Sequence, residues 1–166
     1  MKPLQEWICD TCGQLIRSPE EGWVEWLRDD EMRVGDFRIC HQNAFSPLRK
    51  GDGISPGCQQ YAYDPNVQDL PMDSFVGPQG IVQMLSFVDI GESLDAAYRG
   101  PRVRDFRNWA ETFRRLFLPN YEEARPYFDA AYREGFFGDT NEIFLYLPEN
   151  LRDMIEHYTS TEDERK

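Results

Sequence analysis

The stretch Cys9-Asp10-Thr11-Cys12-Gly13 decides how the front of this chain folds. Two cysteines separated by two residues let two thiolates bind one ion, and the glycine that follows permits the tight turn in which backbone N–H groups point at sulfur. The 166-residue sequence holds four cysteines, and the other two are Cys40 and Cys58. This pattern predicts a structural Zn²⁺ bound in the N-terminal part of the chain.

A tetrahedral zinc site needs two ligands besides Cys9 and Cys12. Cys58 is one candidate, because the glycine-rich segment before it can bring a ligand to the site. The other is His41 or Cys40, since adjacent residues of a strand point to opposite faces and only one of them can face the ion. We favour His41, so the predicted ligands are Cys9, Cys12, His41 and Cys58, with Cys40 as the alternative to His41.

The knuckle is followed by Glu21-Gly22-Trp23-Val24-Glu25-Trp26. The CxxCG motif together with this run resembles the N-terminus of small uncharacterised bacterial proteins that begin with a zinc-ribbon-like module. The resemblance is confined to the N-terminal part of the chain and implies no activity. A regular zinc ribbon has a second CxxC knuckle, whereas this sequence offers Cys40-His41 and Cys58.

Short strands are expected around the knuckle. Residues 22–28 are rich in aromatic and branched side chains, and residues 32–41 alternate loosely, so an antiparallel hairpin with a turn at 29–31 is the simplest arrangement. A segment rich in proline and aspartate follows near residue 70. The predicted organisation is a zinc-binding β module over 1–70, a helical region over 71–160 and a charged tail over 161–166.

Helical periodicity dominates the second part of the chain. The spacing predicts helices over 78–88, over 101–118, over 121–134 with a break near Arg125 caused by Pro126, and from Pro148 onward. The apolar residues predicted to face inward are Ile81, Val82, Leu85 and Val88 in the first helix; Val103, Phe106, Ala110, Phe113 and Phe117 in the second; and Leu151, Met154, Ile155 and Tyr158 in the last. The predicted fold class is therefore α+β, with an N-terminal antiparallel zinc-bearing β-sheet packed with a C-terminal bundle of three to four short helices.

Charge and composition limit the possible partners and compartments. Lys and Arg number 18 against 30 Asp and Glu, a net charge of -12, which opposes sequence-independent binding to nucleic acid. The sequence shows neither a secretory signal nor an apolar run long enough for a membrane span. We therefore expect a cytoplasmic protein, whose cysteines serve as thiols or metal ligands rather than disulfides.

One segment departs from the acidic average and could meet a partner. Between residues 99 and 115 the arginines outnumber the acids, and two tryptophans lie on opposite faces of the strand expected at 22–28. The candidate partner-binding residues are Arg99, Arg102, Arg104, Arg107, Arg114, Arg115, Trp23 and Trp26. These features favour a non-enzymatic interaction, adaptor or regulatory protein, stabilised by structural zinc and bound to another protein.

Two other functions are consistent with the same residues. A zinc-stapled, HNH-like nuclease would have His41 free as the base and Cys40 as the ligand in its place. An acidic inhibitor that mimics nucleic acid would occupy the groove of a DNA-binding protein with its carboxylates.

Overall fold

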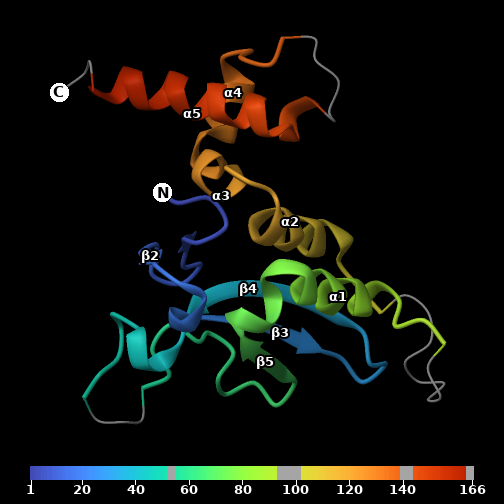
Figure 1. The fold of residues 1–166 in the computed structure, drawn as a ribbon. Coiled ribbons are helices and arrows are strands. Elements are labelled where there is room, and N and C mark those ends of the chain that lie inside the picture. The colour runs from blue at the N-terminus through green and yellow to red at the C-terminus, as the bar shows by residue number, and fades with distance from the viewer. Residues whose placement is uncertain (52–54, 93–101, 139–143, 164–166) are drawn as a thin grey trace.

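The computed structural model describes residues 1–51, 55–92, 102–138 and 144–163 and confirms the α+β fold class (Figure 1). Strands β1 (Trp7–Ile8) and β2 (Leu15–Ile16) form a small antiparallel sheet around the CxxC turn. Strands β3 (Gly22–Arg28), β4 (Val34–His41) and β5 (Val67–Pro71) form a three-stranded antiparallel sheet in the order β4-β3-β5. The predicted hairpin is thus confirmed, with β3 as its central strand.

Helices fill the rest of the described chain: α1 (Gly77–Val88), α2 (Phe106–Phe117), α3 (Tyr121–Ala124), α4 (Phe128–Arg133) and α5 (Pro148–Asp163). In Figure 1, α1 and α2 lie beside the three-stranded sheet, and α3, α4 and α5 lie beyond α2. A 3₁₀ turn over Arg125–Tyr127 separates α3 from α4, which confirms the break predicted from Pro126. No helix in the described part of the chain is long and apolar enough to cross a membrane.

The predicted inward face of α1 is confirmed at Val88, which packs against the core, and is wrong at Ile81, Val82 and Leu85. Gly80, Met84 and Phe87 are buried, whereas Ile81, Val82 and Leu85 are 40%, 69% and 48% exposed. The helix carries apolar residues on both faces, so periodicity alone does not choose between them. Gly80 decides the choice, because a Cβ at this position would overlap the backbone carbonyl of Phe75. Only glycine allows α1 to approach the preceding 3₁₀ turn this closely.

Helix α2 begins later than predicted. Val103 forms an isolated parallel bridge with Val34, and the helix starts at Phe106, where the Asp105 carboxylate accepts hydrogen bonds from two backbone N–H groups. Pro101 lies outside the described residues. The fully buried positions of α2 are Thr112, Arg115 and Leu116, whereas the predicted core residue Phe106 is 52% exposed. The apolar pattern did not predict the buried face of α2 correctly, because that face carries the charged side chain of Arg115.

Two hydrophobic cores share the chain. The first joins the sheets to α1 and α2, and Trp26 is packed there against Phe37, Phe75 and Phe87. This core crosses the boundary expected at residue 70. The second core lies among α3, α4 and α5 and includes Leu151, Met154 and Tyr158, which confirms most of the inward face predicted for the last helix. Of the tail expected at 161–166, residues up to Asp163 belong to α5, and 164–166 lie outside the described residues.

The outer edge of β4 is covered by three separate parts of the chain. The Arg102 carbonyl and the Arg104 N–H bond to the backbone of Val34, and the Asn108 side chain bonds to both the N–H and the carbonyl of Phe37. Asp10 does the same for Ile39, accepting its N–H with a carboxylate oxygen and donating a backbone N–H to its carbonyl. An edge strand left open is prone to pair with another strand, and this cover occupies part of the outer edge of β4. It also fixes the knuckle and α2 on the same strand.

Candidate metal centre and adjoining cavity

Four side chains meet where the CxxC turn contacts the end of β4. Cys9, Cys12, His41 and Cys58 each present one ligand atom, and these atoms lie within 4.8 Å of one another. Cys9, His41 and Cys58 are buried, and Cys12 is half-buried. The cluster could hold a metal ion, and its members come from the turn, the sheet and the loop that leads to β5.

The distances fit a tetrahedral arrangement around one ion. The His41 Nδ1 atom lies 3.5 Å from Cys12 Sγ and 3.8 Å from Cys58 Sγ. Zinc bonds of about 2.3 Å to sulfur and about 2.0 Å to nitrogen, at the tetrahedral angle, place these atoms about 3.5 Å apart. The donor set of three sulfurs and one imidazole is that of structural zinc sites. The residues present therefore fit a zinc ion.

Backbone bonds hold the CxxC turn in its ligand-presenting shape. The Gly13 N–H donates to the Cys9 carbonyl at 2.9 Å, and the Cys9 N–H donates to the Gln14 carbonyl at 2.9 Å. Gly13 has φ 71°, a left-handed conformation that favours glycine, so its place directly after Cys12 is what the turn requires. The tight turn expected at this glycine is confirmed.

His41 is oriented toward the thiols by its other ring nitrogen. Nε2 lies 3.3 Å from the Leu15 carbonyl oxygen. With the proton on Nε2, the ring donates to this carbonyl and presents the Nδ1 lone pair to the cluster. A backbone carbonyl in this position is a common partner of metal-binding histidines, because it fixes both the ring orientation and the tautomer.

Cys58 reaches the cluster on a loop tied to the rest of the site. The Thr11 hydroxyl donates to the Cys58 carbonyl at 2.6 Å, and the Ser46 hydroxyl donates to the Cys58 sulfur at 3.0 Å. Two residues further on, the Glu25 carboxylate accepts the N–H of Gln60 at 2.9 Å. Glu25 is fully buried on the central strand, so the sheet itself positions the loop that carries this ligand.

The thiols depend on a cation for their charged form. Burial raises the pKa of the Cys12 thiol to about 12, well above the usual range, because a thiolate in this low-dielectric setting is poorly solvated. A coordinating divalent cation reverses this balance and deprotonates the bound thiol. The described cysteines form no disulfide, so the sulfurs of Cys9, Cys12 and Cys58 are available to bind a cation.

Cys40 is not a member of the cluster. It is fully buried on β4 beside His41, and burial raises the pKa of its thiol above the usual range. Because neighbours on a strand point to opposite faces, His41 faces the CxxC turn while Cys40 faces the core. Here Cys40 acts as a small apolar side chain.

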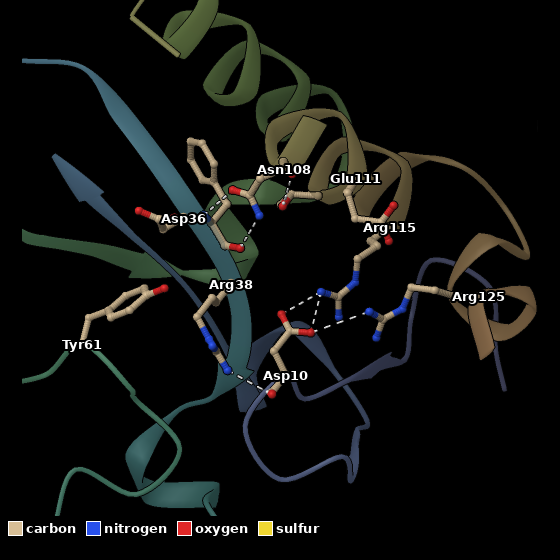
Figure 2. Close-up of a pocket in the computed structure, with 10 residues that line it drawn as sticks. Asp10, Asp36, Arg38, Tyr61, Asn108, Glu111, Arg115 and Arg125 are labelled. Atoms are coloured by element: carbon tan, nitrogen blue, oxygen red, sulfur yellow. Dashed lines mark hydrogen bonds and ion pairs between the residues drawn. The ribbon is translucent and has the colours of Figure 1, made fainter. Parts of the chain in front are cut away.

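An ion-pair network connects the knuckle to the helices. Both Asp10 carboxylate oxygens accept from Arg115 Nη1, at 2.8 and 2.7 Å (Figure 2). Glu122 accepts from Nε and Nη2 of the same arginine. Arg115 Nη2 also donates to the Ile8 carbonyl. Arg115 is 3% exposed, and these contacts satisfy its guanidinium within the protein.

The predicted partner-binding residues do not form one free surface. Arg115 and Trp26 are buried, so neither can present a docking surface, and Trp23 is half-buried. Arg104 pairs with Asp36, Arg102 donates to the Ser86 carbonyl, and the Arg114 guanidinium carbon lies 4.2 Å from the centre of the Tyr146 ring. Arg107 is exposed, and Arg99 lies outside the described residues. The positive charge predicted for this segment is largely used inside the molecule.

Sequence reasoning missed the residues that surround Asp10. Arg38, Tyr61, Asn108 and Arg125 line a cavity of about 340 Å³ together with Asp10 and parts of α2. They come from four distant parts of the chain and share no spacing. The one available signal was Asp10 itself, an acidic residue inside the CxxC turn.

Comparison with protein-family models, with curated proteins and with solved structures found no match. The resemblance of the N-terminal run to zinc-ribbon-like bacterial proteins therefore stays a prediction.

Proposed function

We propose that Cys9, Cys12, His41 and Cys58 bind one structural Zn²⁺, and that the protein is a zinc-stabilised binding protein. The observation that carries the zinc assignment is the convergence of three sulfurs and one imidazole nitrogen within 4.8 Å. Four protein ligands close the coordination shell, whereas a catalytic zinc keeps a position for water. A reducing compartment such as the cytoplasm, where thiols persist, suits such a site.

The zinc assignment is tested by comparing two neighbouring residues of β4. His41→Ala removes a ligand, so we expect purified protein with substoichiometric zinc and a much lower unfolding temperature. Cys40→Ala replaces a buried thiol that faces away from the cluster with a methyl group of similar size. We therefore expect one zinc per chain and a loss of about 1 kcal/mol of unfolding free energy. Loss of zinc in Cys40→Ala with full zinc in His41→Ala would overturn the ligand assignment.

The binding role is supported by the outer face of α1. This helix contains no charged residue, and it exposes Ile81, Val82 and Leu85 along one side. These three exposed apolar residues lie within about one turn of the helix and resemble the anchors by which a helix contacts another protein. The described surface nearby is acidic: Asp73 precedes the helix, and Asp89 and Glu92 follow it, all exposed.

The charge around this face defines the partner that we propose. Acidic residues at both ends of an apolar stripe, in a protein of net charge -12, complement a protein segment that carries apolar side chains bordered by lysine or arginine. The apolar contacts would supply most of the affinity, and the charges would raise the association rate and make it sensitive to salt.

Affinity capture with matched variants tests this role. Proteins retained by the wild-type chain should be lost with Val82→Glu and kept with Tyr132→Glu, because Tyr132 is an 83% exposed apolar residue on a different helix, α4. Retention of the same proteins by both variants would contradict the α1 surface. Binding that Val82→Glu leaves intact, but that moderate salt abolishes, would instead favour the acidic mimic of nucleic acid.

The nuclease alternative needs His41 as a free base. Instead, Nδ1 of His41 lies among the cysteine sulfurs, and Nε2 lies beside the Leu15 carbonyl. Both ring nitrogens are thus engaged, which supports a ligand role and favours a binding protein over a nuclease.

A further inference from the structure

The cavity beside the metal centre has the dimensions of a small-ligand site. It encloses about 340 Å³ between β4, α2 and the loop that carries Tyr61, with Asp10 and Arg125 on the remaining sides (Figure 2). Ligand sites in proteins commonly measure about 300–1,000 Å³. This one is at the lower end, which fits a compact molecule rather than a polymer.

Hydrogen bonds within the protein already connect the walls of the cavity. The Asn108 amide bonds to both backbone groups of Phe37, at 2.6 and 3.1 Å, which locks α2 to β4. Arg115 is held by Asp10 and Glu122, and the Thr112 hydroxyl donates to the Asn108 carbonyl. Preformed walls reduce the ordering cost of binding.

The acceptors that line the cavity are already engaged. Asp36 pairs with Arg104, Glu111 accepts the Tyr121 hydroxyl at 2.5 Å, and Asp10 accepts from Arg115. The amide oxygen of Asn108 accepts the Phe37 N–H. Both oxygens of Asp10 and one oxygen each of Asp36 and Glu111 are thus used within the protein, which leaves fewer acceptors for a ligand that mainly donates hydrogen bonds.

The donors are only partly used. The Nε atoms of Arg38 and Arg125 are buried and have no hydrogen-bond partner among the described residues. Arg125 Nη2 donates to Glu122 at 3.5 Å, and Arg125 Nη1 lies 3.8 Å from Asp10. Arg38 Nη2 donates to the Asp10 carbonyl at 2.9 Å, whereas Arg38 Nε lies 3.9 Å from Glu25, too far for a hydrogen bond. Because the side chains of Arg38 and Arg125 are still 21% and 30% exposed, their remaining Nη N–H groups can donate to an acceptor placed in the cavity.

Tyr61 adds a third donor on the opposite side. Its half-buried ring lies with the hydroxyl directed toward Arg38 (Figure 2), and the Arg38 guanidinium carbon is 5.9 Å from the ring centre. Burial raises the pKa of Tyr61, so the hydroxyl keeps its proton at neutral pH and can donate it.

We propose that this cavity binds a small oxyanion, a carboxylate or a phosphate group, between Arg38, Arg125 and the Tyr61 hydroxyl. Guanidinium groups match the oxygen pairs of both anions, and the resulting charge-assisted bonds are about twice as strong as neutral ones. Glu25 and Glu122 lie within ion-pair distance of Arg38 and Arg125 and help to orient the two guanidiniums. The cavity size selects compact anions, such as a short organic acid or a phosphate monoester.

The test is a titration of the full zinc-loaded chain followed by ¹H–¹⁵N NMR. Sodium phosphate and sodium succinate are added separately at constant ionic strength, with sodium chloride as the reference. We expect saturable shifts of the Asp36–Arg38 and Asn108–Thr112 amides with at least one of the two anions. Saturation with only phosphate or only succinate identifies the preferred group, whereas the absence of saturation with both overturns the proposal.

Matched variants separate a specific site from general charge. Arg125→Gln removes one guanidinium from the cavity and should weaken binding about tenfold. Arg107→Gln makes the same charge change at an exposed position outside the lining and should leave binding within about twofold. Tyr61→Phe removes only a hydroxyl and should also weaken binding. It provides the test of the site if Arg125→Gln folds poorly. Equal weakening by the Arg125 and Arg107 variants, or unchanged binding in both cavity variants, would contradict the site.

Discussion

Asp10 and Arg115 are 105 residues apart in the sequence, yet both Asp10 carboxylate oxygens accept hydrogen bonds from one guanidinium nitrogen of Arg115, at 2.7 and 2.8 Å. Asp10 lies between two cysteines of the metal cluster, and Arg115 lies on the buried face of α2. The same arginine bonds to Glu122 on α3. The turn that presents the candidate metal ligands also contacts the helices, so we expect metal binding and helix packing to depend on each other.

Removing the guanidinium should destabilise the whole chain. Arg115→Met keeps the apolar stem but leaves Glu122, which is 5% exposed, and Asp10 without their main partner. Breaking a buried ion pair from one side costs about 3–5 kcal/mol of unfolding free energy, and we expect a loss in this range by urea denaturation. The control is Arg107→Met on the exposed face of α2, with a change within about 0.5 kcal/mol. Similar values for the two variants would show that the buried network contributes little.

Chelation of the metal should loosen the chain unevenly. Without the ion only backbone hydrogen bonds hold the CxxC turn, so we expect the contacts of Asp10 with the Ile39 backbone and with Arg115 to weaken. In hydrogen-exchange measurements we expect the amides of β1, β2 and the outer edge of β4 to lose most protection, and those of α2 to lose some. The amides of α5 should change least, because their helix belongs to the second core. Uniform loss, or none, would contradict this coupling.

Glu25 gives the stability a measurable pH dependence. Burial raises the pKa of its carboxyl, although the N–H groups of Gln60 and Tyr61 and the nearby Arg38 oppose the shift. A carboxyl whose pKa is higher in the folded state than in the unfolded state contributes stability below the unfolded value, about 4.3, and that contribution is lost as the pH rises through the folded value. Glu25→Gln removes the titration.

The measurement for Glu25 is the difference in unfolding free energy between the wild type and Glu25→Gln, between pH 4 and pH 7. This comparison cancels the effect of pH on the metal centre, which both proteins share. The wild type should lose stability relative to the variant as the pH rises. A difference that grows in favour of the wild type would mean that Arg38 and the two N–H groups outweigh burial.

Gly80 is the position where α1 tolerates no side chain. Because an added Cβ would overlap the Phe75 carbonyl, Gly80→Ala must displace the helix from the turn, at a cost of about 2 kcal/mol or more. Gly51→Ala is the matched control, since nothing lies within 4 Å of its added Cβ. Thermal unfolding should fall by several degrees for Gly80→Ala and little for Gly51→Ala. Equal midpoints would show that α1 adjusts without cost.

Local patterns in the sequence predicted the parts of the fold that local patterns control. The strand over 22–28 and the turn at Gly13 follow from residue types and short spacings, and the break near Arg125 follows from one proline. The metal ligands could be proposed because thiol and imidazole groups have few other uses in such a pattern. The alternation of a strand indicated that only one of Cys40 and His41 could face the ion, and the contact of β4 with the CxxC turn selects His41.

The features that sequence reasoning missed depend on tertiary contacts. Helix α1 is apolar on both sides, so the close approach of Gly80 to Phe75, and not its periodicity, selects the buried face. Arg115 is buried because Asp10 and Glu122 neutralise it. Asp10 is 105 residues away and Glu122 lies on the next helix, so the pattern of α2 indicates neither partner. A run of arginines thus looked like a surface patch, whereas several of its members are structural.

The central claim is that three sulfurs and one imidazole nitrogen bind a single zinc ion. The most direct measurement is X-ray absorption at the zinc edge, combined with elemental analysis, on protein purified without added metal. We predict one zinc per chain, with three sulfur neighbours at about 2.3 Å and one nitrogen at about 2.0 Å. A chain without stoichiometric zinc, or a zinc surrounded by oxygen, would contradict the account.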